Sequence, residues 1–246
     1  MCSQTADASG SAHAAGGPPA RLSAAFVPER LGAPTTVSFA VSIDPPAVTG
    51  PIPLTAVQVK YPSNLGLATS GLGLAACEPS ALELQGPEAC PPDSKMGQGT
   101  ALVEVPFGPT LVSESATLEI YAAPSSDGYV HLAILAHGSE PVIASIVLAG
   151  VLHPGELSIS IPPIASLPGA PYVALVKMHA SLGGALTYYE RVRGHTVAYR
   201  PKGIGLPDTC PRGGWRLAAG FTFADGESSQ ASTAIPCPHG AHGRRG

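Results

Sequence analysis

The feature that most constrains this chain is its division into short runs of β-forming residues, each ended by a turn signal. Val, Ile, Leu, Thr, Phe and Tyr gather in the runs, and Gly, Pro, Asn and Asp separate them. The 27 prolines and 29 glycines disfavour long helices, because proline removes a helix donor and glycine costs backbone entropy. We predict strands at Leu22–Val27, Thr36–Ile43, Leu54–Tyr61, Ala101–Val105, Thr117–Ala122, Tyr129–His137, Val142–Val151, Glu156–Ile161, Tyr172–Ser181, Thr196–Tyr199, Trp215–Phe223 and Gln230–Ile235.

Alternation of apolar and polar residues indicates that several of these strands turn one face to a core. Leu157, Ile159 and Ile161 alternate with Ser158 and Ser160. A second apolar stripe comprises Val130, Leu132 and Ile134. Many short strands of this kind predict an all-β chain, folded as a multi-stranded antiparallel β-sandwich of the immunoglobulin-like or jelly-roll-like type.

Two tight turns and one helix can be placed along the chain. Asp-Gly pairs accept the positive φ angles of tight β-turns, so Asp127-Gly128 and Asp225-Gly226 each predict a hairpin. Pro79–Gln85 predicts a short helix, with proline in its first turn and Gly86 as its stop. Trp215 alternates in register with Leu217, which places it in the core.

The domain organisation follows from where these strands begin and end. Residues 1–20 and 239–246 are small and polar without periodicity, so we expect a disordered N-terminal segment and a flexible tail. Residues 21–238 are long enough to bury one large core. Two β domains divided near residue 110 are the alternative.

Four of the five cysteines form two local couples in the sequence. Cys77 and Cys90 would close a loop rich in Pro and Gly, and Cys210 and Cys237 would clasp the base of the Asp225-Gly226 hairpin. We predict two disulfides, each stabilising the fold by roughly 3 kcal/mol through loop closure. Free buried thiols are the alternative, whereas neither couple has the close spacing typical of zinc ligands.

The charge argues against nucleic acid as a partner, and the hydropathy argues against a membrane-spanning segment. The formal net charge of −4 offers no positive field for a phosphate backbone, so nucleic acid is not an expected partner. The longest apolar run, at 142–152, has 11 residues. A membrane-spanning helix needs about 20, so we predict no transmembrane segment.

The disulfides predict an oxidising, extracellular or cell-envelope location. The first residues lack the basic and apolar regions of a secretory signal, although Ala12–Ala15 has the small residues of a cleavage site. We therefore expect an export signal that is not visible in this sequence. Cys2 would then be a remnant or part of a removed segment.

Motifs that carry chemistry are few. The sequence contains neither a GxSxG elbow nor an HExxH helix, and the glycine-rich run Gly71–Cys77 lacks the lysine of a phosphate loop. Glu104, Glu119 and Glu190 could serve a hydrolase, but nothing in the sequence pairs them. The histidines near strand ends are interpreted as solvated surface residues. We therefore predict no cofactor and no metal site.

The densest polar segment, YYERVRGHTVAYRPK at 188–202, is the candidate binding surface. Exposed aromatic and basic side chains often carry recognition. A hairpin around Gly194 with a solvated face explains the same residues. The candidate binding residues are Tyr188, Tyr189, Arg191, Arg193, His195 and Arg200.

Two cysteine-bounded segments resemble parts of uncharacterised exported β-rich proteins of high-GC actinobacteria. The first, at 77–101, has the pattern C-x12-C-P-x2-S-x-hydrophobic-G, and the second is the terminal hairpin at 210–238. The resemblance implies export and β-structure. It implies no catalytic residue, because we can name no activity for that group.

Together these features favour an exported, non-enzymatic protein with a structural, adhesive or binding role at the cell envelope, where an envelope polymer or a protein would be its partner. A hydrolase assembled from loop residues is one alternative. A carrier of an apolar small molecule is another, and it would show an apolar internal pocket of several hundred Å³.

Overall fold

The computed structural model describes residues 16–46, 50–67, 75–107, 110–139, 143–165, 171–183, 188–199 and 204–238, and most of them lie in β-strands. One α-helix, α1 (Pro79–Gln85), and two short 3-10 helices, η2 (Pro87–Ala89) and η3 (Pro92–Ser94), interrupt the strands. The strands are β1 (Ala20–Val27), β2 (Pro34–Ile43), β3 (Leu54–Lys60), β4 (Gly66–Leu67), β5 (Lys95–Phe107), β6 (Thr110–Ala123), β7 (Val130–Gly138), β8 (Ala144–His153), β9 (Glu156–Ser160), β10 (Ala174–Gly183), β11 (Tyr188–Val192), β12 (His195–Tyr199), β13 (Ile204–Gly205), β14 (Trp215–Phe223) and β15 (Ser228–Ile235).

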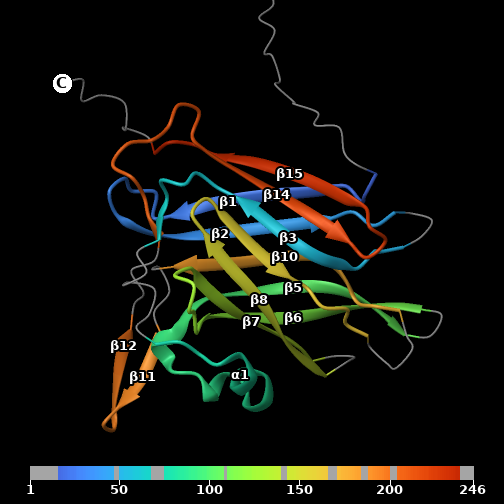
Figure 1. Cartoon of the computed structure of the whole chain (residues 1–246), viewed down its shortest axis with the longest axis horizontal. Coiled ribbons are helices and arrows are strands. Elements are labelled where there is room, and N and C mark those ends of the chain that lie inside the picture. Colours follow the sequence, from blue (N-terminus) through green and yellow to red (C-terminus); the bar gives the residue numbers. More distant parts are fainter. Residues whose placement is uncertain are drawn as a thin grey trace, which may run out of the picture.

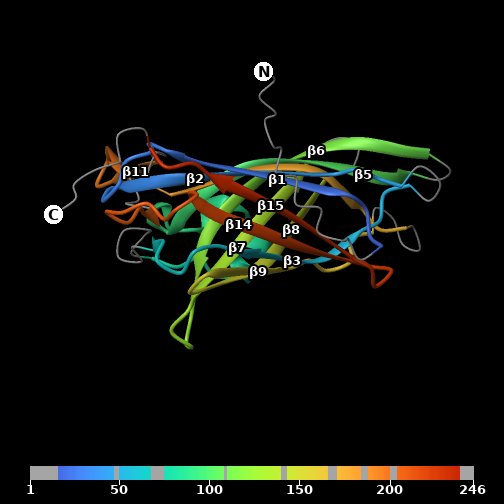
Figure 2. The ribbon, with the colours of Figure 1, turned by 90° about the horizontal axis from the view of Figure 1, so that it is seen from above.

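One large antiparallel sheet contains all of these strands except β11 and β12. Its main strands follow the order β1, β2, β10, β5, β6, β7, β8, β9, β3, β14 and β15. The sheet curls until β1 lies beside β15, so it is nearly closed into a barrel (Figures 1 and 2). The all-β prediction is thereby confirmed, while the choice of a sandwich in particular stays a prediction.

The last step of closure joins β1 and β15, and it differs from the other contacts. Ten successive antiparallel pairings relate β1 to β15, so these two strands run in the same direction. The backbone N–H of Gly17 donates to the carbonyl of Ser228 at 3.3 Å, near the start of both strands. Among the described residues no ladder continues from this bond. We call this contact the seam.

The core fills the inside of the curled sheet. Strands β14 and β15 present Trp215, Phe221, Phe223 and Ile235 to it, all almost fully buried. The ring of Phe26 on β1 packs edge-on against Trp215, with 5.3 Å between the ring centroids. Trp215 is therefore a core residue, as predicted. The stripe of Leu157, Ile159 and Ile161 also packs against this core.

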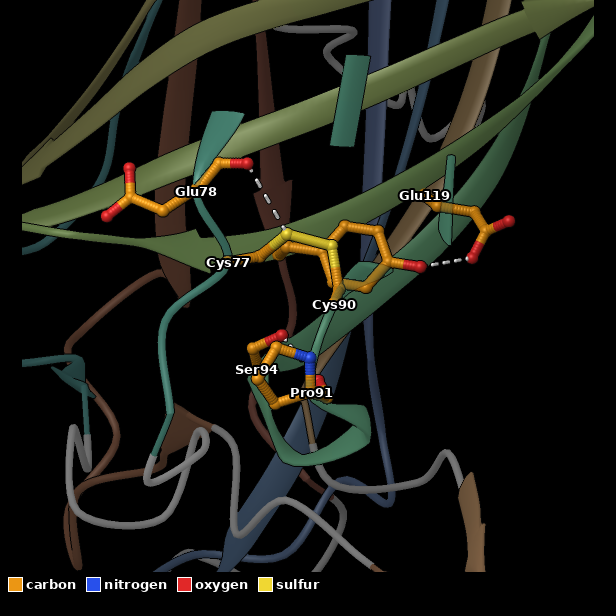
Figure 3. The surroundings of a disulfide bond; sticks show 7 residues. Cys77, Glu78, Cys90, Pro91, Ser94 and Glu119 are labelled. Carbon is orange, nitrogen blue, oxygen red and sulfur yellow. Dashed lines mark hydrogen bonds between the residues drawn. A yellow bond between two sulfur atoms is a disulfide. The ribbon is translucent and has the colours of Figure 1, made fainter. Parts of the chain in front are cut away.

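A smaller core lies on the outer side of the barrel. There α1 (Figure 1) and the disulfide between Cys77 and Cys90 (Figure 3) cover the side chains of Ala133 and Leu135 of β7, which belong to the same buried cluster. Leu82 of α1 is completely buried at this contact. This second core explains why the inward and outward residues of β7 are both apolar.

The predicted helix, turns and disulfides are confirmed. Helix α1 has the predicted bounds, and the two Asp-Gly turns join β6 to β7 and β14 to β15. Cys210 and Cys237 form the second disulfide at the open end of the β14–β15 hairpin, with 5.8 Å between their Cα atoms. Residues 1–15, with Cys2, and residues 239–246 lie outside the described residues.

Strand β5 begins six positions earlier than the predicted strand at Ala101–Val105, because two glycines that resemble a turn signal belong to the strand. A Cβ atom on Gly97 would lie 2.3 Å from the carbonyl oxygen of Ser181 on β10. A Cβ on Gly99 would lie 2.3 Å from that of His179. Both glycines therefore let the backbones of β5 and β10 approach closely.

Candidate functional site

The candidate site is an apolar cavity inside the barrel, partly open to solvent, with a volume of about 180 Å³. Its lining comes from β2, β3, β5 to β10, the segment between β9 and β10, and Phe221 of β14. Every described residue of this lining except one is apolar, and most are aliphatic. The exception is Glu114 on β6.

The cavity exists because small residues face one another across four adjacent strands. Ala101 of β5 pairs with Ala116 of β6, Ala116 pairs with Gly138 of β7, and Gly138 pairs with Ala144 of β8. All four line the cavity. Side chains this short cannot fill the space that Leu or Ile fills at neighbouring levels. We call these four residues the small-residue row.

Glu114 lies one inward position beyond this row. Inward residues of β6 are spaced by two, so Glu114 shares its face with Ala116, Leu118 and Ile120. The side chain is only 4% exposed. Within the described part of the chain, its carboxylate has no hydrogen-bond or ion-pair partner. The described side-chain atoms that are fully buried without a partner are Trp215 Nε1 and Ser229 Oγ, so the Glu114 oxygens keep a small accessible surface.

The neighbouring carboxylate of Glu104 shows the contrasting arrangement. Glu104 on β5 lies opposite Ser113 of β6, in the next register position along from Glu114. The Ser113 hydroxyl donates to Glu104 Oε1 at 2.7 Å, and this contact is exposed. The two carboxylates are therefore neighbours in the sheet, but one is hydrated and paired while the other lines an apolar cavity.

Sequence reasoning missed Glu114, although the signal is present. Val112, Glu114, Ala116, Leu118 and Ile120 alternate with Ser, Thr and Glu residues, which puts Glu114 in an apolar register. The strand predicted from the sequence begins at Thr117, so it does not include the part of β6 that carries Glu114.

A histidine beside a serine, which would favour a hydrolase, occurs on the outer face. His137 Nδ1 lies 2.8 Å from Ser145 Oγ, across the β7–β8 pair. A catalytic triad also needs a carboxylate that orients the histidine and donors that stabilise an oxyanion. No described carboxylate contacts His137, and the pair is exposed. It provides one element of such a site.

Two further polar clusters stabilise local structure. In the β6–β7 turn, the hydrogen bond from His131, followed by one from the backbone of Tyr129, lowers the pKa of Asp127 to about 2. On the outer face of β6, Glu119 (Figure 3) accepts hydrogen bonds from Lys95 and Tyr121. Burial would raise the pKa of Glu119, but these two hydrogen bonds and the Lys95 charge together lower it.

A wider depression of about 630 Å³ lies on the outer face of β1, β2, β10 and β5. Arg21, Lys177 and His179 provide its basic side chains. Arg21 is already paired with Asp44, since its guanidinium donates to that carboxylate at 2.6 Å. The depression has mixed polar and apolar walls and stays open to solvent, so it offers less selectivity than the internal cavity.

The predicted binding segment forms a separate two-stranded hairpin, β11–β12, beside the barrel (Figure 1). Arg193, with φ of 49°, and Gly194 form its turn, which agrees with the alternative explanation of this segment as a hairpin around Gly194. Tyr189 is 70% exposed, and it shares one face with Arg191 because the two are separated by two positions. His195 pairs next to the turn on the other face. The hairpin thus divides the predicted surface between two faces.

The remaining predicted binding residues, Arg200 and the side chain of Tyr188, lie outside the described part of the chain. Among the described residues, no three His, Cys, Asp or Glu side chains gather in a way that could hold a metal ion. None of the helices described here combines the length and apolarity needed to cross a membrane.

Comparison with protein-family models, curated proteins and solved structures finds no match to this chain. The resemblance to exported actinobacterial proteins stays a prediction. A functional interpretation therefore depends on the chemistry of the cavity.

Proposed function

We propose that the protein binds a small apolar molecule inside its barrel and acts as a carrier or receptor for it. The observation that carries this proposal is the internal cavity of about 180 Å³, whose described lining is apolar apart from one carboxylate. An apolar cavity of about 150 Å³ is known to take up benzene. The ligand, or the part of it that enters, is accordingly small.

The volume distinguishes this proposal from that of a general lipid carrier. Pockets for drug-sized ligands measure roughly 300 to 1,000 Å³. The cavity here, at about 180 Å³, is smaller than this and smaller than the several hundred Å³ expected from the sequence for a carrier, so the proposal concerns a molecule on the scale of one aromatic ring. Among the described residues, no feature supports a structural or adhesive role at the envelope as directly as the cavity supports ligand binding.

An extracellular or cell-envelope location belongs to the same proposal. Its support is the pair of disulfides, Cys77–Cys90 and Cys210–Cys237, which are typical of proteins from oxidising compartments. An envelope polymer or protein would bind to the exposed β11–β12 hairpin, through Tyr189 and Arg191.

The proposal is tested by filling the cavity. Ala144→Leu adds three carbon atoms to the small-residue row, so we expect toluene to bind at least about tenfold more weakly than to the unmodified protein. Ala149→Leu is the control, because Ala149 lies on the same strand but is exposed on the outer face. Affinities would be measured by NMR titration, with thermal unfolding as a check of folding.

Equal toluene binding by both variants would show that the ligand does not use this cavity. Absence of toluene binding to the unmodified protein, together with absence of any ligand in native mass spectrometry of material purified from its source, would overturn the proposed function.

A further inference from the structure

We infer that Glu114 selects the ligand, and that the molecule bound in the cavity is an amine with a small apolar body. This inference rests on the proposed function and specifies its ligand.

The position of Glu114 suits a role in the cavity rather than a role in stabilising the fold. The residue is 4% exposed, lines the cavity, and has no partner within the described part of the chain. Carboxylates that stabilise structure in this protein are paired, as Glu104 is with Ser113 and Glu119 with Lys95. Glu114 contributes no such bond, so its carboxylate is free to accept one from a ligand.

The space beside the carboxylate suits a small body with one polar end. The cavity of about 180 Å³ exceeds the roughly 150 Å³ that holds benzene by about the volume share of one water molecule. Glu114 lies at the level next to Ala116, so the small-residue row and the carboxylate adjoin. An aromatic ring over the row would therefore place a single substituent near Glu114.

Charge then determines which substituent is favoured. Glu114 provides the single charged group in the described lining. A protonated amine would donate a charge-assisted hydrogen bond and neutralise this charge, whereas a carboxylate would be repelled by it. A hydrocarbon would cover the carboxylate without donating a hydrogen bond to it. We therefore expect affinity to fall in the order amine, alcohol, hydrocarbon, carboxylate.

The experiment compares four molecules of nearly equal size: benzylamine, benzyl alcohol, toluene and benzoate. Each is titrated at pH 7.5 into the unmodified protein and into Glu114→Gln, Glu114→Leu and Glu104→Gln. Glu104→Gln is the matched control, because it removes a carboxylate from the adjacent strand on the outer face. Thermal unfolding of each variant verifies that it is folded.

In the unmodified protein we expect benzylamine to bind about tenfold or more tightly than toluene, with benzoate weakest. Glu114→Gln should remove most of this preference, Glu114→Leu should reverse it in favour of toluene, and Glu104→Gln should keep it. Toluene binding without a preference for benzylamine, or a preference that persists in Glu114→Gln, overturns the inference alone. Failure of all four molecules to bind overturns the inference, and together with the absence of any ligand in native mass spectrometry it overturns the proposed function as well.

Discussion

Two glutamates on the same strand illustrate how a single residue's position sets its role. Glu114 and Glu119 are five positions apart on β6, so alternation turns them to opposite faces of the sheet. Glu119 meets Lys95 and Tyr121 on the outer face. Glu114 meets the apolar cavity. The first stabilises the fold, and the second is available to a ligand.

The Glu119 cluster predicts a pH dependence of stability. Because the folded-state pKa of Glu119 is lowered from its ordinary value of 4.5, the carboxylate contributes stability above that value. This contribution is lost as the pH falls through the lowered pKa. The side chain is about a quarter exposed, so we expect Glu119→Gln to lower the free energy of unfolding at pH 7 by about 1 kcal/mol.

Urea unfolding at several pH values from 7 down to about 2 would measure this difference. The gap between Glu119→Gln and the unmodified protein should narrow below pH 4.5 and vanish in stronger acid. Lys95→Gln should show a similarly weakened pH dependence. A gap that is constant at all pH values would contradict the prediction.

At the scale of elements, the sequence predicts the parts well because their signals are local. Alternation places β9 and β14, proline and glycine bound α1, and Asp-Gly marks two hairpins. The cavity could not be predicted in this way. The small-residue row depends on the exact register of three successive strand pairs, and no single segment of the sequence shows that this register brings Ala101, Ala116, Gly138 and Ala144 side by side.

The glycines of β5 provide a test of the close contact with β10. Gly99→Ala would place a Cβ atom 2.3 Å from the carbonyl oxygen of His179, so we expect the strands to shift. The free energy of unfolding should fall by about 1–3 kcal/mol, as for other overpacked sites. Chemical denaturation monitored by circular dichroism would measure the loss.

Gly220→Ala on β14 is the matched control. A Cβ atom there meets nothing within 4 Å. Its free energy of unfolding should stay within about 0.5 kcal/mol of the unmodified protein or rise slightly. An equal loss in both variants would show that strand propensity, rather than the contact with β10, limits β5.

For the whole molecule, closure of the barrel depends on the two ends of the described chain. β1 supplies Leu22 and Phe26 to the core, and the β14–β15 hairpin supplies Trp215. Sequence reasoning predicted the disulfide that clasps this hairpin, because both cysteines flank a recognisable turn. It did not predict that β15 would meet β1, since no local pattern relates strands that lie at opposite ends of the chain.

Removing that disulfide should weaken the whole fold. Cys210→Ser with Cys237→Ser opens a loop of 27 residues, so we expect a loss of about 3 kcal/mol. The melting temperature should then fall by roughly 6–12 °C, given the usual scaling for chains of this size. Calorimetry under non-reducing conditions would measure the change. A melting temperature within about 2 °C of the unmodified protein would contradict the prediction.

The seam has a consequence for how molecules of this protein meet one another. An odd number of antiparallel strands cannot close with an antiparallel pair, and parallel pairs are slightly less stable per residue. With no ladder described across the seam, β1 and β15 each keep an edge of backbone donors and acceptors. If β1 swings away, the vacated edge of β2 best fits the β1 strand of a second molecule. Concentrated protein would thus form strand-exchanged dimers more readily than a fully closed barrel would.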